Sequence, residues 1–335
     1  MTTAAVVGLG DISSLHLDAI AADPAIELVA VGDSDASRAA AASRRWGVPW
    51  FSSADALLAR VRPDVVHITT PHHQHVPVAL AALADGVHVL TEKPVAHTLA
   101  EAERLAAAAK DSAARVGVVL QNRYNPTSVA IRQALDAGAI GRPVGARAAV
   151  WWHRDAAYYA ASPWRGHWTE SGGGVLINQA IHTLDLLLWF LGDAVGVRGA
   201  AANLTLREDI EVEDTATIVI DHASGVRSTM FATTTHHTND DVELRIDGEA
   251  GSLRLVAGRA ELVVADGVRV LATDAQADGV RSYWGLGHAR LVSDFHASLA
   301  RPGPFWLGLD AGIAPLRVLR EVYRQSGLLP AGQPL

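Results

Sequence analysis

Three polar side chains interrupt a strongly apolar stretch of the chain, GGGVLINQAIHTLDLLLWFLG at residues 172–192. Asn178, His182 and Asp185 follow one another at helical spacings, so one face of a helix carries an amide, an imidazole and a carboxylate. Buried in a core without a hydrogen-bond partner, each group would lower the free energy of unfolding by roughly 1–3 kcal/mol. We therefore expect this face to meet a cleft or a ligand, with the glycine triplet letting the backbone run close beneath a pocket. A core histidine satisfied by its neighbours is the alternative.

A second candidate site follows the first predicted strand, where VVGLGDIS places Gly8 and Gly10 ahead of a helix. Glycine lets the backbone approach a pyrophosphate, and the helix N-terminus offers N–H groups and the positive end of its dipole. Ser13 stands where the dinucleotide fingerprint G-x-G-x-x-G has its third glycine. Asp33 ends the next strand, about 20 residues on, where a carboxylate accepts hydrogen bonds from an adenosine ribose. A bare turn at the glycines and a helix N-cap at Asp33 are the alternatives.

The acidic side chain of Asp33 also bears on the choice between two cofactors. A 2′-phosphate would meet like charge there, which favours NAD over NADP. Ser34 and Arg38 lie close by in the sequence and keep NADP open.

One lysine stands at a position suited to acid/base chemistry. The segment HVLTEKP at 88–94 puts Glu92 and Lys93 at the carboxyl end of another predicted strand. Open α/β sheets bind their ligands at that edge, and a lysine there can take up or give a proton. A solvated surface lysine is the alternative.

The elements that must position these residues fall into two groups. The first third of the chain alternates helical runs with apolar strands, which predicts a parallel sheet covered on both faces. These strands are expected at 4–10, 26–33, 63–71, 86–94 and 115–123. Beyond the predicted domain boundary between 123 and 124, β-rich runs joined by turn signals predict an α+β domain with a largely antiparallel open-faced sheet. The C-terminal helix is expected to be able to pack back on the first domain.

The bulk composition narrows the function classes. The chain has 335 residues, is 49% hydrophobic and 19% charged, and carries a net charge of −8, which argues against nucleic acid as the main partner. It has no cysteine, so disulfides and thiol chemistry are excluded. We expect a cytoplasmic protein, because no basic leader and no uncharged apolar run of about 20 residues is present. We expect no catalytic metal, because the histidine clusters at 72–75 and 236–237 lack the helical carboxylate pairing of zinc sites.

Several segments together make the sequence similar to a known family. They are GLGDISSLH, TTPHHQH, HVLTEKP, QNRYNP, YYAASPWRGHW and the stretch at 172–192. In this order and spacing they resemble the glucose–fructose oxidoreductase/inositol dehydrogenase (Gfo/Idh/MocA) family over essentially the whole chain. The resemblance implies a Rossmann domain, then an α+β domain whose sheet face makes a homodimer or homotetramer contact. It implies hydride transfer between a nicotinamide cofactor and a secondary alcohol or ketone of a sugar, inositol or related polyol.

The resemblance also carries roles onto individual residues. Lys93 and His182 match the family's acid/base groups. Asn178 and Ala180 stand where the family usually has aspartate and glycine. We expect Asn178 to position the substrate by hydrogen bonds and to leave proton transfer to Lys93 and His182. Asp185 is expected to anchor His182 or a neighbouring backbone group.

The matched segments supply the remaining expected contacts. Aromatic faces stack on the C–H side of a sugar ring, and arginine donates to hydroxyls or to an anionic group. Substrate contacts are expected from Asn178, Trp152, His153, Tyr159, Trp164, Arg165 and Tyr124. Cofactor contacts are expected from Gly8, Gly10, Asp11, Ile12, Asp33, Ser34, Arg38, Thr70, Pro71, His75, Glu92, Lys93 and Asn122. Trp151 is expected to face the core, since it alternates with Trp152 along a strand.

Other functions remain open on the sequence. An NAD-dependent glycoside hydrolase would use transient oxidation to assist bond cleavage. A nucleotide-sugar 3-dehydrogenase or ketoreductase would use Arg165 for a phosphate. A dinucleotide-binding sensor without chemistry would have no use for Lys93 and His182.

Overall fold

The computed structural model describes residues 1–274 and 287–329, which form two compact units. The first unit comprises residues 1–120 and 287–313, and the second comprises the described parts of 121–286 and 314–335. The chain changes unit between 120 and 121, where the sequence led us to expect a boundary between 123 and 124. It also returns to the first unit for residues 287–313 before it ends in the second.

The first unit is built on a six-stranded parallel sheet in the order β3-β2-β1-β4-β5-β6. This confirms the predicted Rossmann domain. The order reverses between β1 and β4, and ligands of open α/β sheets bind beyond the carboxyl ends of strands at such a reversal. The strands are β1 (Thr2–Val7), β2 (Ile26–Gly32), β3 (Trp50–Phe51), β4 (Val65–Ile68), β5 (His88–Thr91) and β6 (Val116–Val118).

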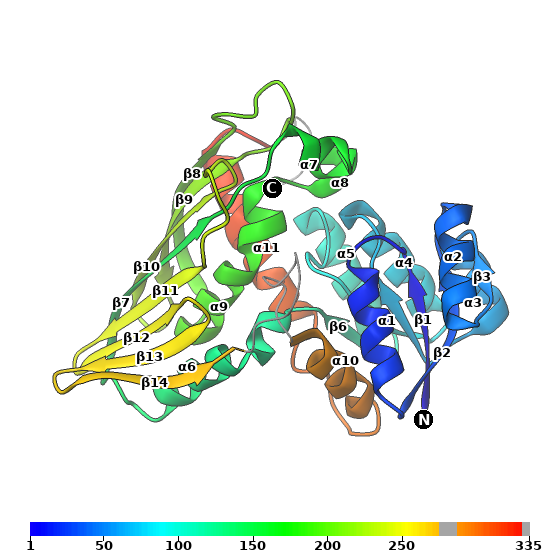
Figure 1. The fold of residues 1–335 in the computed structure, drawn as a ribbon, viewed down its shortest axis with the longest axis horizontal. Helices are drawn as coiled ribbons and strands as arrows, with labels where there is room; N and C mark the ends of the chain where they lie inside the picture. Colours follow the sequence, from blue (N-terminus) through cyan, green and yellow to red (C-terminus); the bar gives the residue numbers. More distant parts are fainter. Residues whose placement is uncertain (275–286, 330–335) are drawn as a thin grey trace. The chain divides into compact units, whose positions relative to one another are not determined.

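Helices lie on both faces of this sheet, with α1 and α10 packed together on one face (Figure 1). Short polar side chains begin several of them, since a side-chain oxygen at the N-cap satisfies an N–H that has no partner within the helix. Asp35 accepts from two such groups at the start of α2, and Ser53 begins α3 in the same way. The helices are α1 (Ser13–Ala22), α2 (Ala36–Trp46), α3 (Ala54–Val61), α4 (His72–Ala84), α5 (Leu99–Lys110) and α10 (Gly287–Ser298).

The second unit contains an eight-stranded sheet in the order β14-β13-β12-β11-β7-β10-β9-β8. All neighbours are antiparallel except the pair β7 and β10, which confirms the predicted α+β domain. The strands are β7 (Pro143–Trp151), β8 (Ala194–Ala202), β9 (Thr215–His222), β10 (Arg227–Thr233), β11 (Glu243–Gly248), β12 (Gly251–Val256), β13 (Arg259–Val264) and β14 (Gly267–Thr273).

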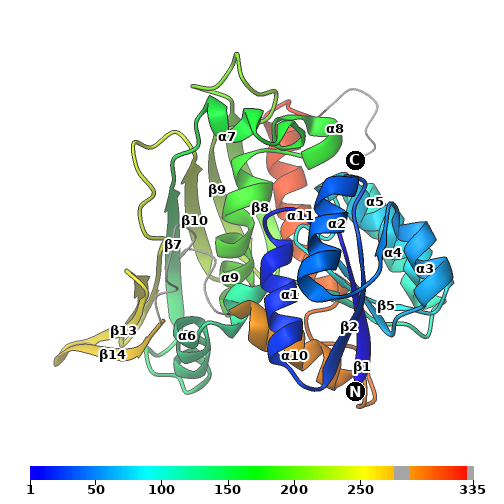
Figure 2. The same ribbon diagram turned by 45° about the vertical axis from the view of Figure 1, so that its right-hand side comes forward.

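One face of the second sheet is packed with helices, among them α6, α9 and α11 (Figure 2). The helical elements of this unit are η1 (Gln121–Tyr124), α6 (Pro126–Asp136), α7 (Ala156–Ala160), η2 (Pro163–Gly166), α8 (Trp168–Ser171), the π-helical turn η3 (Leu176–Ala180), α9 (Ile181–Leu191) and α11 (Leu309–Gln325), which belongs to this unit from residue 314 on.

The other face of this sheet carries Trp151, and the expectation that Trp151 faces the core is wrong. Strand alternation buries Ala148 and Val150 and turns Trp151 outward, where it is 37% exposed. Its ring lies 4.4 Å from the ring of Phe231 on β10. The open sheet face therefore carries an aromatic pair.

One segment within the described chain, residues 168–191, is long and apolar enough to cross a bilayer by composition alone. In the structure 83% of the most apolar 18-residue stretch of this segment is buried. The segment packs as a core helix of a folded unit does.

Candidate active site

The loop between β1 and α1 has the geometry expected of a dinucleotide site. Gly8 has a φ of 90°, and a Cβ there would lie 2.6 Å from the backbone nitrogen of Thr70. Only glycine accommodates both that conformation and that approach. Gly10 is exposed, and a Cβ added to it would meet nothing within 4 Å. Asp11 and Ile12 follow at the N-terminus of α1, so this open position faces a helix start.

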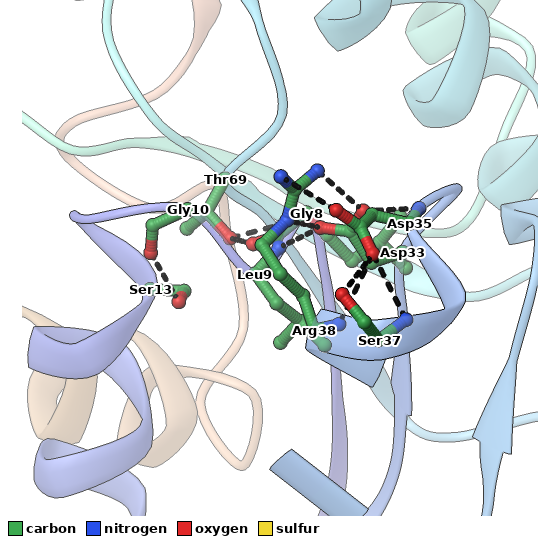
Figure 3. Close-up of polar contacts among 10 residues, drawn as sticks. Gly8, Leu9, Gly10, Ser13, Asp33, Asp35, Ser37, Arg38 and Thr69 are labelled. Atoms are coloured by element: carbon green, nitrogen blue, oxygen red, sulfur yellow. Dashed lines mark hydrogen bonds and ion pairs between the residues drawn. The ribbon is translucent and has the colours of Figure 1, made fainter. Parts of the chain in front are cut away.

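Asp33 is buried beside this loop and holds it in place (Figure 3). Its Oδ2 accepts from the Leu9 backbone N–H at 2.6 Å, and its Oδ1 accepts from the Asp35 N–H at 2.7 Å. The guanidinium of Arg38 donates to both oxygens. Asp35, and not Asp33, caps α2, so the capping alternative for Asp33 is wrong.

The four hydrogen bonds to Asp33 occupy about as many lone-pair sites as a carboxylate has. A ribose hydroxyl can bind to this carboxylate only if one donor moves. The Arg38 side chain is 52% exposed, which makes it the donor that can move. Ser34 is exposed next to it. The loop, the helix start and this carboxylate together fit NAD.

The carboxyl ends of β4 and β5 carry the other expected cofactor residues. The half-buried loop residues Thr70 and Pro71 follow β4, and the half-buried Lys93 follows β5. His75 is buried between the two loops, with Nε2 2.9 Å from the Thr70 carbonyl and Nδ1 2.7 Å from the Pro94 carbonyl. It braces the loops at this edge, which makes it a positioning residue.

Glu92 precedes Lys93 and is only 4% exposed. Its Oε2 accepts from the Lys93 backbone N–H at 3.1 Å, and its Oε1 lies 3.1 Å from His16 Nε2. Burial raises the pKa of the Glu92 carboxyl, but hydrogen bonds from His16 and His288 outweigh burial and hold that pKa well below its ordinary range. Glu92 therefore carries a negative charge directly beside the lysine.

In the second unit, two of the three polar residues at helical spacing, Asn178 and His182, lie on the accessible side of their helical segment. Asn178 belongs to the π-helical turn η3, and His182 lies in the first turn of α9. Both are half-buried, whereas the residues around them between 173 and 188 are buried. Turns of π-helix occur frequently at functional sites. The alternative of a buried core histidine at His182 therefore does not hold, and the amide and the imidazole share one accessible face.

Asp185 does not anchor His182 as we expected. Its carboxylate is 1% exposed and accepts from Arg123 Nε at 2.9 Å and from Nη2 at 2.6 Å. The Arg123 guanidinium also lies over the Trp189 ring, 5.4 Å from its centre. The pair ties η1 to α9, and η1 contains the half-buried Asn122 and Tyr124.

The glycine triplet serves close packing against protein, and not against a pocket as we expected. A Cβ on Gly174 would overlap the Glu213 carbonyl oxygen, and one on Gly173 would overlap the Tyr323 hydroxyl. The Glu213 carboxylate accepts from the Gly174 N–H at 2.8 Å, the Leu176 N–H at 3.0 Å and the Tyr323 hydroxyl at 2.8 Å. Glu213 thus fixes the start of the helix that carries Asn178 and His182, a role that sequence reasoning missed.

The aromatic segment 152–168 divides into several environments. Tyr159 is 3% exposed in a small core cluster with Ile210 and Val212, and burial raises its pKa to about 12. The Arg165 guanidinium lies over the rings of Tyr158 and Trp164, at 4.7 and 5.6 Å.

Two further residues of this segment are held by the loop before β11. Trp152 Nε1 donates to the Asp240 carbonyl at 3.2 Å, and His153 Nδ1 lies 2.6 Å from the His236 carbonyl. The Arg154 guanidinium lies over the Trp152 ring. Three environments therefore divide this segment. Trp164 and Arg165 form a half-buried aromatic–cationic pair, Trp152 and His153 contact the loop before β11, and Tyr159 packs in the core.

Comparison with known proteins agrees with this geometry. Residues 2–120 match the model of an oxidoreductase family with an NAD-binding Rossmann fold, and residues 128–254 match the GFO/IDH/MocA C-terminal domain. The chain belongs to the Gfo/Idh/MocA oxidoreductase family. The first unit of this Gfo/Idh/MocA protein is the NAD-binding domain of an oxidoreductase.

Individual relatives of this Gfo/Idh/MocA protein are similar over most of its length. D-apiose dehydrogenase of Paraburkholderia graminis is 31% identical over 79% of this chain and 70% of its own. Inositol 2-dehydrogenase of Rubrobacter xylanophilus is 30% identical over 75% of this chain and 70% of its own. The crystal structure of the WlbA dehydrogenase from Bordetella pertussis with NADH and UDP-GlcNAcA has a TM-score of 0.87 and 29% identity, covering 97% of this chain and 95% of that one.

Proposed function

We propose that this protein is an NAD-dependent dehydrogenase or reductase acting on a secondary alcohol or ketone of a sugar, inositol or related polyol. The observation that carries the proposal is that the same chain has a dinucleotide loop in its first unit and a polar helix face, on η3 and α9, in its second. NAD bound at Gly8, Gly10 and Asp33 supplies the hydride acceptor. The names of the two relatives, a D-apiose dehydrogenase and an inositol 2-dehydrogenase, support a polyhydroxylated substrate.

Lys93 and His182 are the proposed acid/base groups of the reaction. Oxidation of an alcohol requires a group that removes the hydroxyl proton, and reduction of a ketone requires a group that returns it. The ionised Glu92 directly precedes Lys93, so the backbone of the proposed proton carrier is held by a buried carboxylate. Asn178, one helical turn before His182, donates to and accepts from substrate hydroxyls and positions them.

The substrate pocket is proposed to use the aromatic segment. Trp164 and Arg165 present a ring and a guanidinium side by side, a combination that suits the C–H face and the hydroxyls of a sugar. Trp152, His153 and Tyr124 are the further proposed contacts. Tyr159 supports these residues from the core cluster and is not proposed as a direct contact.

A homo-oligomer formed through the open face of the second sheet is part of the proposal. On that face Trp151, 37% exposed, packs against the half-buried Phe231. Exposed apolar residues grouped on one sheet face are typical of an interface. The cytoplasm is the proposed location, since the chain has no cysteine for disulfides.

A substrate panel tests the proposed function. Purified protein is incubated with NAD or NADP and, in turn, aldoses, inositols and uridine-diphosphate sugars, while the absorbance of the reduced nicotinamide is followed. We expect NAD reduction with a free sugar or an inositol. The proposal fails if no member of the panel, in either direction, changes the reduced-cofactor absorbance of a preparation that binds NAD.

A further inference from the structure

A row of histidines runs through the core of the first unit and ends at Glu92. His16 lies on α1, His67 on β4 and His296 on α10, and His16 and His67 are fully buried. His67 sits in the central strand between Val6 of β1 and Leu90 of β5, where an apolar side chain is the usual choice.

The side chains of this row are joined by four consecutive contacts. Thr2 Oγ1 lies 2.7 Å from His296 Nδ1, and His296 Nε2 lies 3.0 Å from His67 Nε2. His67 Nδ1 then lies 2.9 Å from His16 Nδ1, and His16 Nε2 lies 3.1 Å from Glu92 Oε1. Thr2 is half-buried at the amino end of β1, whereas Glu92 follows the carboxyl end of β5. We call these five side chains the histidine chain.

Only one arrangement of protons satisfies every contact when Glu92 is ionised and the imidazoles are neutral. A carboxylate only accepts, so His16 Nε2 must donate, which leaves His16 Nδ1 to accept from His67 Nδ1. His67 Nε2 then accepts from His296 Nε2, and His296 Nδ1 accepts from the Thr2 hydroxyl. Each donor in the chain therefore points toward Glu92.

The surroundings hold His67, His296 and Glu92 in these charge states. Burial holds the pKa of His67 well below its ordinary value and lowers that of His296 to about 4. Near neutral pH both rings are therefore uncharged, while Glu92 is ionised. His288 also faces Glu92, with Nε2 3.5 Å from Oε1, and burial lowers its pKa as well. Within residues 1–274 and 287–329, no group of three or more His, Asp or Glu side chains could hold a metal ion, so the row does not form a metal site.

We propose that the histidine chain exchanges protons between solvent at Thr2 and the buried Glu92 beside Lys93. For uptake, water gives a proton to Thr2 Oγ1 while the Thr2 hydroxyl proton passes to His296 Nδ1. The proton on His296 Nε2 passes to His67 Nε2, the one on His67 Nδ1 to His16 Nδ1, and the one on His16 Nε2 to Glu92 Oε1. Uptake leaves each ring in its other tautomer, and release starts from that state, carries a proton from Glu92 to Thr2 and restores the first arrangement. One proton crosses the core, and no ring keeps a charge.

The link to catalysis rests on the proposed function. Oxidation of a secondary alcohol releases one proton and reduction of a ketone consumes one, and Lys93 is the proposed group that handles it. Glu92 directly precedes Lys93 and is too buried to exchange protons with water itself. Through the histidine chain, Lys93 could regain or lose its proton while a substrate still fills the site.

Nuclear magnetic resonance of 15N-histidine-labelled protein tests the chain without any substrate. We expect the proton on Nε2 of His16, on Nδ1 of His67 and on Nε2 of His296, assigned through His→Gln variants of each. Any other tautomer at one of these rings would overturn the proposed chain, because its donors would no longer run in one direction.

Stopped-flow kinetics tests the coupling to catalysis. Reduced-cofactor absorbance and a pH-indicator dye are recorded in one turnover for the wild type, for H67F and for the control H222Q, a buried histidine of the second unit. In ketone reduction by H67F we expect hydride transfer within about twofold of wild type but proton uptake from solvent slower by about tenfold or more. The control should keep the two signals together. H67Q, which keeps a polar side chain that cannot relay, should repeat the lag and serves if H67F does not fold.

The outcomes separate the two proposals. Proton uptake that keeps pace with hydride transfer in folded H67F or H67Q would refute the relay. If the wild type reduces no cofactor with any substrate, the proposed function fails, and the tautomer measurement alone still decides whether the chain has the inferred proton order.

Discussion

Arg38 donates to both carboxylate oxygens of Asp33, from Nε to Oδ2 at 3.3 Å and from Nη2 to Oδ1 at 2.9 Å. The hydrogen bonds from Arg38 compete with those of any hydroxyl that binds Asp33. They also place a cation where a 2′-phosphate would lie. The same guanidinium therefore opposes NAD at the carboxylate and favours NADP beside it.

Removal of this guanidinium should sharpen cofactor preference. In R38A we expect the Kd for NAD to stay within about threefold of wild type or to fall, because the carboxylate is released. The Kd for NADP should rise about fivefold or more, because a phosphate loses its charge-assisted donor. Titration calorimetry with both cofactors measures this. An NADP affinity unchanged by R38A would show that Arg38 does not face the phosphate.

Alanine at two glycines of the same loop should affect different properties, stability at Gly8 and NAD affinity at Gly10. In G8A the added Cβ meets the Thr70 backbone at a φ of 90°, so the melting temperature should fall by several degrees. In G10A there is open space, so stability should stay at the wild-type value while NAD binding weakens. Thermal unfolding and NAD titration of both variants decide this. Equal NAD binding by G10A and wild type would place the pyrophosphate elsewhere.

Local patterns explain why much of this site could be predicted from sequence. The loop at Gly8 and the carboxylate of Asp33 belong to one β-α-β unit, where strand ends and glycine spacing fix the geometry. The alternation of strands and helices likewise predicted the first sheet, and the β-rich runs joined by turn signals predicted the second. What the sequence did not reveal are contacts between distant segments, such as Asp185 with Arg123 and Gly174 with Glu213. Their partners depend on packing and not on spacing.

The same limit applies to the histidine chain. His16, His67 and His296 stand far apart in the sequence, and each looks like an isolated core histidine there. Their contacts exist because α1 and α10 pack together beside β4. Trp151 shows a different failure, since alternation correctly separates it from Trp152 but does not say which face of the sheet is buried.

The buried Glu213 should make stability depend on pH. Burial raises the pKa of its carboxyl from an ordinary 4.5 to about 7, although hydrogen bonds from Leu176 and Gly174 oppose the rise. The folded state then binds the proton more tightly than the unfolded state, so the free energy of unfolding should be highest below about pH 4.5 and fall as pH rises to about 7. Urea unfolding across this window measures it. E213Q should lose most of this slope, and an identical slope in both proteins would assign it to other groups.

Replacing only one partner of the Arg123–Asp185 ion pair should lower the free energy of unfolding strongly. In R123M the Asp185 carboxylate, 1% exposed, would lose its partner, and we expect unfolding to cost about 3–5 kcal/mol less. The double variant R123M/D185L should recover much of this loss, because no charge remains buried. Denaturant unfolding of both proteins provides the measurement. A double variant no more stable than R123M would mean that the pair acts through packing alone.

The acid/base assignment of Lys93 and His182 is the central claim, and Asn178 provides its internal comparison. If the Asn178 amide only positions the substrate, N178A should raise KM and leave kcat nearly unchanged. Steady-state kinetics on the substrate found in the panel gives both constants. A fall in kcat as large as that in H182A would instead give Asn178 a part in the chemical step.

The most direct test is the turnover of K93M and H182A, measured as reduced-nicotinamide formation at saturating substrate, with NAD binding of each variant checked in parallel. Loss of a general acid or base predicts kcat at least about 10²-fold below wild type for each variant. The NAD Kd of H182A should stay within about threefold of wild type, and K93M is measured at saturating NAD, so that the loss is assigned to chemistry. Near-normal turnover by both variants would contradict the account.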